Sequence, residues 1–215
     1  MNPQPITRNP QLPASKGQIA VFLDRDGTIC EEVGYIDSIE RLRLIPRSAA
    51  AIKLLNDRGF KVVGVTNQSG VARGFFPEEL LEELHAELSR QLREEGAHLD
   101  GIYFCPHHPS DGNAPYVQVC NCRKPASGLL LQAAQDLGLD LSASYMIGDH
   151  FSDVECAQGV GAQGILLLTG HGPEALAKIE NWSQSPSYIA ADLYEAVQWI
   201  ISQAEKGTDF NCETP

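Results

Sequence analysis

The sequence predicts an α/β protein in which helices cover both faces of a parallel sheet. Short apolar runs of strand length alternate along the chain with segments whose apolar residues recur at helical spacing. This alternation is typical of βα units, whose right-handed crossovers make the strands parallel. Acidic and polar residues directly follow several apolar runs, and a Rossmann-like sheet has its functional site at those strand ends.

Six apolar runs are expected to form the strands of the sheet. The first has the composition of a fully buried strand, and the others are likewise short and bounded by polar or glycine-containing segments. None is long enough to cross a bilayer, which takes about 20 apolar residues. The predicted strands are residues 19–23, 60–65, 101–104, 144–147, 164–168 and 188–190.

The helices between these strands are predicted from apolar spacing and from end signals. Ala50, Leu54 and Leu55 lie on one helical face, and their segment stops at Gly59, a usual helix end. Pro77 opens a long helix whose first turn carries glutamates, as the helix dipole favours. The predicted helices are residues 46–58, 77–95, 127–137, 153–158, 174–181 and 192–204.

Length and composition predict one domain with a substantial core. The chain has 215 residues, of which 43% are hydrophobic and 20% are charged. These values exclude a wholly disordered chain. We assign residues 18–205 to a single domain, and residues 1–17 and 206–215 to flexible tails. The segments 29–46 and 70–105, in which a further domain could be inserted, are too short for a large cap domain.

Charge and targeting signals limit the partners and the compartment. The net charge of −12 disfavours general nucleic-acid binding, because phosphates attract basic surfaces. The first residues lack the apolar stretch of a signal peptide, so the six cysteines are not expected to form a disulfide framework. We expect a cytoplasmic monomer with no nucleic-acid or membrane partner.

Four polar segments should meet at one end of the sheet. Residues 24–26 follow the first predicted strand and residues 66–69 follow the second, while Asp149 and Asp153 follow the fourth. Residues 123–125, Arg-Lys-Pro, precede a predicted helix. An acidic D-x-D pair alone is most often an ordinary turn, but the whole ordered set favours a catalytic site.

These residue types suit phosphoryl transfer through an aspartyl-phosphate intermediate. When a carboxylate attacks a phosphate at ~4 Å, each unit pair of charges repels by roughly 4 kcal/mol at an effective dielectric of about 20, so cations are required. Asp24, Asp149 and the backbone carbonyl of Asp26 can hold Mg²⁺, with Asp153 as a possible fourth ligand. Lys124 supplies a further positive charge.

The remaining catalytic roles fall to Asp26 and Thr66. Asp26 is close enough in sequence to protonate the leaving oxygen and then to deprotonate the attacking water. The Thr66 hydroxyl and nearby backbone N–H groups can hold phosphoryl oxygens. Further substrate-binding candidates in these two segments are Arg25, Asn67, Gln68 and Ser69.

A cluster of cysteine and histidine lies in the loop at residues 105–122. The spacing C-x-H followed by C-x-C offers three thiolates and one imidazole, which suits a closed, structural Zn²⁺ site. His107 and His108 are both candidates for the imidazole ligand, and reduced loop cysteines without metal are the alternative. A zinc ion here would position the adjacent Arg123 and Lys124.

The ordered set of motifs resembles the haloacid dehalogenase superfamily of phosphohydrolases over nearly the whole chain between the tails. The resemblance implies that Asp24 is the nucleophile and Asp26 the general acid and base. It also implies that Thr66 and Lys124 bind phosphate and that Asp149 holds the metal.

Within that superfamily, the segments CPHHP, CNCRKP, FLDRDGTI and VTNQSGVARG resemble the heptose bisphosphate phosphatases. That resemblance implies a zinc loop, no large cap domain, and Mg²⁺ and Zn²⁺ as cofactors. It also implies a small phosphorylated sugar as the substrate and removal of the C7 phosphate of D-glycero-D-manno-heptose 1,7-bisphosphate as the reaction. It implies that Arg123 contacts the phosphate that stays on the sugar. The implied zinc ligands are Cys105, His107, Cys120 and Cys122, and the implied substrate loop is Glu32, Val33, Gly34 and Tyr35.

Other functions are less well supported by the sequence. Histidinol-phosphate phosphatases share a closely similar core and zinc loop and are the nearest competitor. A non-catalytic zinc-stabilised binding module would not need both Asp24 and Asp26, and a polynucleotide phosphatase would need a basic stripe. His150 departs from the Lys or Arg usual in the resembled family, so it either changes substrate preference or is a solvent-facing loop residue.

Overall fold

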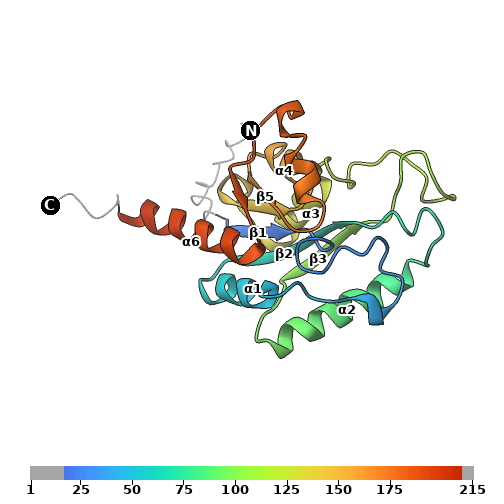
Figure 1. Cartoon of the computed structure of the whole chain (residues 1–215), viewed down its shortest axis with the longest axis horizontal. Helices are drawn as coiled ribbons and strands as arrows, with labels where there is room; N and C mark the ends of the chain where they lie inside the picture. Colours follow the sequence, from blue (N-terminus) through green and yellow to red (C-terminus); the bar gives the residue numbers. More distant parts are fainter. Residues whose placement is uncertain (1–16, 210–215) are drawn as a thin grey trace, which may run out of the picture.

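The computed structural model describes residues 17–209, in which six parallel strands form one sheet between two layers of helices (Figure 1). The strand order is β3-β2-β1-β4-β5-β6, so β1 is central and pairs with β2 and β4. The strands are β1 (Ala20–Leu23), β2 (Lys61–Asn67), β3 (Gly101–Cys105), β4 (Tyr145–Gly148), β5 (Gln163–Leu167) and β6 (Tyr188–Ala190). The predicted fold class is confirmed.

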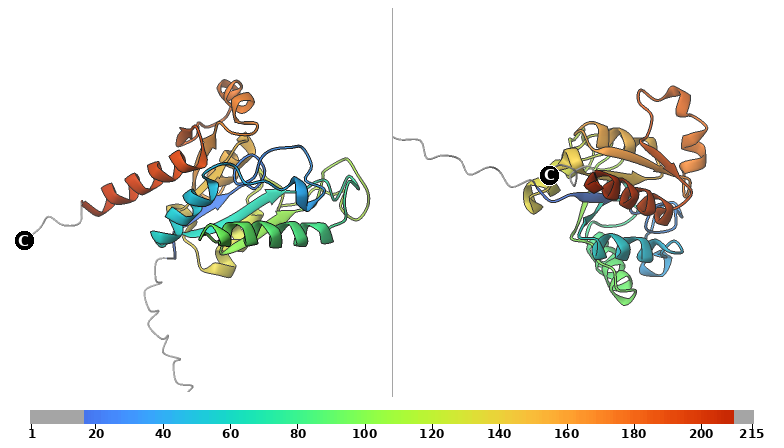
Figure 2. Two further views of the ribbon diagram at one scale, coloured as in Figure 1. Left: turned by 60° about the horizontal axis from the view of Figure 1, so that its bottom comes forward. Right: turned by 90° about the vertical axis from the view of Figure 1, so that its left-hand side faces the viewer.

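The two helix layers bury opposite faces of the sheet, as the views in Figure 2 also show. Because strand side chains alternate, Val21 and Leu23 join a core with α1, α2 and α6, whereas Ala20 and Phe22 join a core with α3 and α4. The helices are α1 (Ser48–Asp57), α2 (Glu79–Glu94), α3 (Gly128–Leu137), α4 (Phe151–Gln158), α5 (Gly172–Leu176) and α6 (Leu193–Asp209).

Helix α2 illustrates how the sequence forms and seats a helix. Leu81, Leu84, Leu88 and Leu92 recur every three or four residues and are all buried, while glutamates occupy the first turn. Each buried leucine contributes about 1.5–3 kcal/mol to packing. The helix ends before Gly96, whose φ of 75° suits a glycine.

Several element boundaries differ from the predictions, and β2 continues to Asn67, so that Thr66 and Asn67 are its last residues and do not follow it. The predicted helix 174–181 is divided into α5 and a 3₁₀ turn (Ile179–Asn181), since the exposed Ala177 and Lys178 supply no apolar face between them. Helix α4 starts earlier than expected, because His150 caps it. Helix α6 continues to Asp209, so residues 206–209 of the predicted tail are helical. The predicted tails at 1–16 and 210–215 lie outside the described residues.

In the part of the chain that the structure describes, the connections at the carboxyl ends of the strands are loops and helices without a domain of their own. Between β1 and α1 the chain forms a loop with one 3₁₀ turn (Ile39–Arg41), and between β2 and β3 it forms α2. Within residues 17–209 no additional domain covers the carboxyl ends of the strands. In the same residues, no helix combines the length and apolar character needed to cross a membrane.

Candidate active site

A cavity of about 440 Å³ opens at the carboxyl ends of the central strands. Its walls come from the loop after β1, the end of β2, the segment before α3 and the loop after β4. The five residues predicted to carry out or support the chemistry all line it: Asp24, Asp26, Thr66, Lys124 and Asp149. The fold therefore brings together groups that lie up to 125 positions apart in the sequence (24 to 149).

Lys124 is the cation at the floor of this cavity. Its Nζ lies 3.0 Å from Oδ1 of Asp24 and 2.7 Å from Oδ1 of Asp153, and it donates a hydrogen bond of 2.8 Å to the carbonyl of Val65. Burial alone would lower the pKa of Lys124, but the charges of Asp153 and Asp24 outweigh it and raise that pKa. Lys124 is therefore held as a fixed positive charge beside the Asp24 carboxylate.

Asp26 is oriented by two neighbours. Arg25 donates to it in a bidentate pair, from Nε to Oδ1 at 2.8 Å and from Nη2 to Oδ2 at 2.8 Å. Gln68 Nε2 donates to Oδ2 of Asp26 at 2.9 Å and to the Thr66 hydroxyl at 2.9 Å. These contacts fix the Asp26 carboxylate at the cavity wall.

The structure places Arg25, a predicted substrate-binding residue, outside the cavity lining. Its side chain is 1% exposed and does not line the cavity, because the guanidinium turns into the core to meet Asp26. Ser69 is also buried and away from the cavity lining. Asn67 and Gln68 do line it.

Three carboxylates gather at the site expected for the metal. Ligand oxygens of Asp24, Asp149 and Asp153 lie within 4.8 Å of one another. Both oxygens of Asp153 are already engaged, one with Lys124 and the other with the backbone N–H of His150 at 3.1 Å. Asp24 and Asp149 are thus better placed than Asp153 to hold a cation.

The electrostatics of these carboxylates fit a divalent cation. Burial raises the pKa of Asp24 to about 6, although Lys124 opposes the rise. Burial, followed by the charge of Asp24, raises the pKa of Asp149 to about 8. Two ionised carboxylates are therefore unfavourable here without a cation, and hard oxygen donors are what Mg²⁺ prefers.

Two glycines make room for the Asp149 carboxylate. A Cβ on Gly27, whose φ is +76°, would lie 2.0 Å from Oδ2 of Asp149. A Cβ on Gly170, whose φ is +49°, would lie 2.1 Å from the same oxygen. That oxygen also accepts a hydrogen bond of 2.7 Å from the backbone N–H of His171. Asp149 is consequently enclosed on one side and free at Oδ1 to face the cavity.

The predicted zinc ligands converge in the loop that follows β3. Sγ of Cys122 lies 3.3 Å from Sγ of Cys105 and 3.2 Å from Sγ of Cys120, and Cys105 and Cys120 are 3.6 Å apart. Nδ1 of His107 lies 3.3 Å from Sγ of Cys122. A tetrahedral zinc with bonds of about 2.3 Å separates its sulfur ligands by about 3.8 Å, close to this arrangement.

The structure distinguishes the two candidate histidines. His107 belongs to the cysteine cluster. His108 turns away, since its Nδ1 accepts a hydrogen bond of 2.8 Å from the backbone N–H of Asp111 and its Nε2 lies 3.2 Å from Arg73. The donor set of three thiols and one imidazole thus fits a structural zinc.

The loop after β3 also positions the two cations that follow it. Arg123 lines the cavity and donates from Nη1 to the carbonyl of His107 at 3.1 Å. The Asn67 side chain bonds twice to the backbone of Lys124, accepting from its N–H at 3.0 Å and donating to its carbonyl at 3.1 Å. These bonds connect the loop to the end of β2.

The predicted substrate loop is only partly at the cavity. Glu32, Gly34 and Tyr35 line it, but the exposed Val33 lines a separate surface hollow. Glu32 is half-buried, and burial raises the pKa of its carboxyl group. His150 lines the exposed rim of the cavity and caps α4 through Nδ1. His150 is thus a cavity residue, although its side chain is exposed.

Sequence reasoning missed two residues of the cavity, His171 and Ser152. His171 follows β5, so its place after a strand at the catalytic end was the available signal. Its Nε2 lies 3.8 Å from Oε2 of Glu32, so the loops after β1 and β5 approach each other across the cavity. Ser152 belongs to the first turn of α4 and gave no signal in the sequence.

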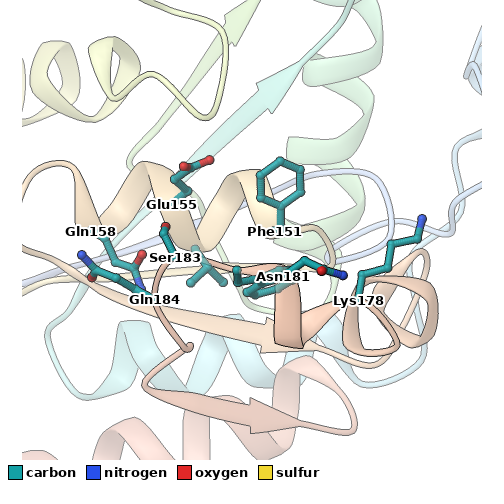
Figure 3. A pocket seen from close by; sticks show the side chains of 9 residues that line it. Phe151, Glu155, Gln158, Lys178, Asn181, Ser183 and Gln184 are labelled. Atoms are coloured by element: carbon teal, nitrogen blue, oxygen red, sulfur yellow. The ribbon is translucent and has the colours of Figure 1, made fainter.

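A second pocket of about 410 Å³ lies between α4 and the segment after α5 (Figure 3). Glu155 and Gln158 of α4 and Lys178, Asn181 and Ser183 contribute to its walls. It contains none of the residues predicted for the site and no paired carboxylates. The cavity at the strand ends is therefore the candidate active site.

The fold and this cavity define a hydrolase of the haloacid dehalogenase-like class. A family model described as "HAD-hyrolase-like" matches residues 121–196. The structure resembles the crystal structure of the D,D-heptose 1,7-bisphosphate phosphatase from B. bronchiseptica complexed with magnesium and phosphate, with a TM-score of 0.77 and 30% identity. That match covers 86% of this chain and 99% of the other.

Sequence relatives narrow the class. The chain is 44% identical to the D-glycero-D-manno-heptose-1,7-bisphosphate 7-phosphatase of Thermosynechococcus vestitus, over 85% of this chain and 95% of that protein. It is 40% identical to the D-glycero-beta-D-manno-heptose-1,7-bisphosphate 7-phosphatase of Escherichia coli K12, over 86% and 96% of the two chains. The chain belongs to this family of phosphatases.

Proposed function

We propose that the chain is a Mg²⁺-dependent phosphatase that converts D-glycero-D-manno-heptose 1,7-bisphosphate to heptose 1-phosphate. The observation that carries the proposal is the grouping of Asp24, Asp26 and Lys124 in one cavity. Relatives that are 40–44% identical bear the name of this activity and match the chain over nearly all of their own length.

The reaction consists of two displacements at phosphorus. The Asp24 carboxylate attacks, and the phosphorus–oxygen bond to the sugar breaks while Asp26 gives its proton to the leaving oxygen. The phosphoryl group is then bound to Asp24. Asp26, now ionised, takes a proton from a water molecule, which attacks phosphorus, releases phosphate and restores Asp24.

Fixed groups hold the phosphoryl oxygens during both steps. Lys124 remains charged because two carboxylates raise its pKa, and its position beside Asp24 lets it bind an oxygen of the phosphoryl group transferred to Asp24. The Thr66 hydroxyl, already aligned by Gln68, can donate to a second oxygen. When bound by Asp24, Asp149 and the Asp26 carbonyl, Mg²⁺ would neutralise the repulsion between nucleophile and phosphate.

The proposed Zn²⁺ has a structural role. Cys105, His107, Cys120 and Cys122 would give it four protein ligands and leave no open position for catalysis. Its function would be to hold the loop whose end carries Arg123. Arg123 in turn is the candidate partner for the phosphate that stays on the sugar, because a guanidinium can bind phosphate bidentately.

The test is phosphate release from a substrate panel in buffer containing MgCl₂. The panel contains heptose 1,7-bisphosphate, heptose 7-phosphate, fructose 1,6-bisphosphate and histidinol phosphate. We expect the highest kcat/KM for heptose 1,7-bisphosphate, with heptose 1-phosphate as the product. A preference for histidinol phosphate over every sugar bisphosphate would replace this proposal with the related amino-alcohol phosphatase activity.

A further inference from the structure

Two buried nitrogen atoms beside the active site have no hydrogen-bond partner among the described residues. They are Nη1 of Arg25 and Nε2 of His85, which lies on α2. Buried polar atoms are nearly always paired, so each such atom requires an explanation. Arg25 is also the residue that orients Asp26, through the Nε and Nη2 atoms at the other side of its guanidinium.

These atoms belong to one packed region. The loop after β1 runs alongside α2 (Figure 1), and its Ile29 shares a core with Leu84 and Leu88, which flank His85 on that helix. The His85 ring packs against Phe104 of β3, with ring centroids 5.5 Å apart. Arg25 itself is 1% exposed in this region.

The electrostatics of His85 agree with a nearby guanidinium. Burial and, to a smaller extent, the positive charge of Arg25 lower the pKa of His85 to about 4, while Asp26 acts in the opposite direction. The imidazole is therefore neutral at neutral pH, with one donor and one acceptor nitrogen. An enclosed nitrogen near a cation is favoured as the acceptor, because its lone pair then faces the positive charge.

We propose that His85 is a positioning residue for the active site. Its Nε2 accepts a hydrogen bond from one enclosed water that in turn accepts from Nη1 of Arg25, and this bridge anchors the guanidinium that holds the Asp26 carboxylate. Both unpaired atoms are then satisfied by the same water molecule. This role rests on the proposed function, in which Asp26 is the general acid and base.

The consequence for catalysis is specific to proton transfer. Nε and Nη2 of Arg25 bond to Asp26, so the guanidinium can rotate unless its remaining nitrogen, Nη1, is also held. If Nη1 loses its hydrogen bond, the Asp26 carboxylate is no longer oriented toward the leaving oxygen, while Asp24 can still attack phosphorus. Sugar alkoxides need the proton from Asp26 as the phosphorus–oxygen bond breaks, whereas p-nitrophenolate leaves without one.

The test compares three variants at one position. In His85→Gln the amide oxygen can replace Nε2, in His85→Asn the amide reaches only the Nδ1 position, and His85→Leu has no acceptor. For each variant, kcat/KM is measured on heptose 1,7-bisphosphate and on p-nitrophenyl phosphate. Thermal unfolding of each variant reports its folding, and the Gln and Asn pair gives a polar comparison if the Leu variant does not fold.

We expect kcat/KM for the sugar substrate to fall about ten- to a hundredfold in the Asn and Leu variants, part of the 10²–10⁴-fold effect of general acid catalysis. The value for p-nitrophenyl phosphate should fall less than about threefold, and the Gln variant should stay near wild type. Equal losses on both substrates, or a Gln variant no better than Asn, would overturn the positioning role.

A failure of the proposed function has a different signature. In that case the wild type itself would not cleave heptose 1,7-bisphosphate. The comparison is then made with the alkyl phosphate of the panel that the wild type cleaves fastest, because the argument depends on the leaving group and not on the sugar. A larger loss of kcat/KM on that alkyl phosphate than on p-nitrophenyl phosphate would support the role of His85, and equal losses would overturn it.

Discussion

Lys124 and Asp153 form a buried ion pair in which Nζ lies 2.7 Å from Oδ1 and the two side chains are 1% and 0% exposed. The same nitrogen is 3.0 Å from Asp24. Asp153 therefore balances the charge of Lys124, whose ammonium group also lies beside the Asp24 carboxylate. Its other oxygen accepts from the N–H of His150 and ties the pair to the start of α4.

Replacing Asp153 with asparagine should destabilise the protein strongly. Removing one partner of a buried ion pair leaves the other charge uncompensated, at a cost of about 3–5 kcal/mol. Urea unfolding would measure the loss. The matched control is Asp57→Asn, which breaks an ion pair with Lys53 whose side chains are 46% and 58% exposed, and we expect it to change stability little. Equal effects of both variants would show that Asp153 does not hold Lys124 electrostatically.

Asp24→Asn should abolish turnover without unfolding the protein. The amide is nearly isosteric but is neither a nucleophile nor a good ligand for Mg²⁺, so we expect kcat to fall at least about a thousandfold. Burial raises the pKa of Asp24 to about 6, so ionised Asp24 is unfavourable without metal. The variant should accordingly unfold at a temperature no lower than wild type in magnesium-free buffer at pH 8. A kcat of the Asp24→Asn variant equal to that of the wild type would rule out a covalent intermediate on Asp24.

Magnesium should stabilise the protein more at high pH than at low pH. The folded-state pKa values of Asp24, about 6, and Asp149, about 8, exceed the usual 3.8, so the metal-free folded state binds more protons than the unfolded state between about pH 4 and 8. Stability without magnesium then falls as pH rises through this window. Mg²⁺ competes with those protons, so the increase in Tm on adding MgCl₂ should be larger at pH 8 than at pH 5.5. An Asp149→Asn variant should lose most of that increase, and an increase independent of pH would contradict the assignment.

Much of this architecture could be predicted because local signals and topology agree. The strand runs are short and apolar, and in a parallel sheet the residues at the carboxyl ends of β1, β2 and β4 must meet at one edge. That rule alone brings Asp24, Thr66 and Asp149 together. The imidazole in the cysteine cluster could not be chosen from spacing, since His107 and His108 are adjacent and only the path of the loop separates them.

Side-chain direction was the main limit of sequence reasoning. Arg25 and Val33 lie in the right segments, yet one turns into the core to bind Asp26 and the other faces solvent. His171 follows β5, but its approach to Glu32 depends on two loops far apart in the sequence. The split between α5 and its following 3₁₀ turn coincides with the exposed Ala177 and Lys178, and a short periodic pattern does not reveal that exposure.

The cysteine cluster should bind about one zinc per chain. Burial raises the pKa of Cys105, so metal binding there must displace a proton, and the binding energy is coupled to folding of the loop. Cys120→Ser should lose the metal and lower Tm. Cys156→Ser is the control, because Cys156 is a buried thiol outside the cluster. Elemental analysis of protein purified without chelator measures the metal, and absence of zinc from the wild type would exclude the site.

Arg123→Ala should weaken the use of a bisphosphate far more than that of a monophosphate. Arg123 lines the cavity, and no ion pair with a carboxylate engages it within residues 17–209. A charge-assisted hydrogen bond contributes roughly 1.5–3 kcal/mol, which corresponds to a loss of about ten- to a hundredfold in kcat/KM. The measurement is kcat/KM on heptose 1,7-bisphosphate and on heptose 7-phosphate, which lacks the phosphate at C1.

Two further variants distinguish recognition of the second phosphate by Arg123 from a general effect on the active site. Lys124→Ala should depress both substrates together, because Lys124 contacts the phosphoryl group that reacts in each of them. Arg90→Ala removes an exposed arginine of α2 and should change neither. Zinc content must be checked in the Arg123 variant, since Arg123 also bonds to the carbonyl of His107. If Arg123→Ala retains its zinc and still reduces both substrates equally, Arg123 shapes the loop and does not recognise the second phosphate.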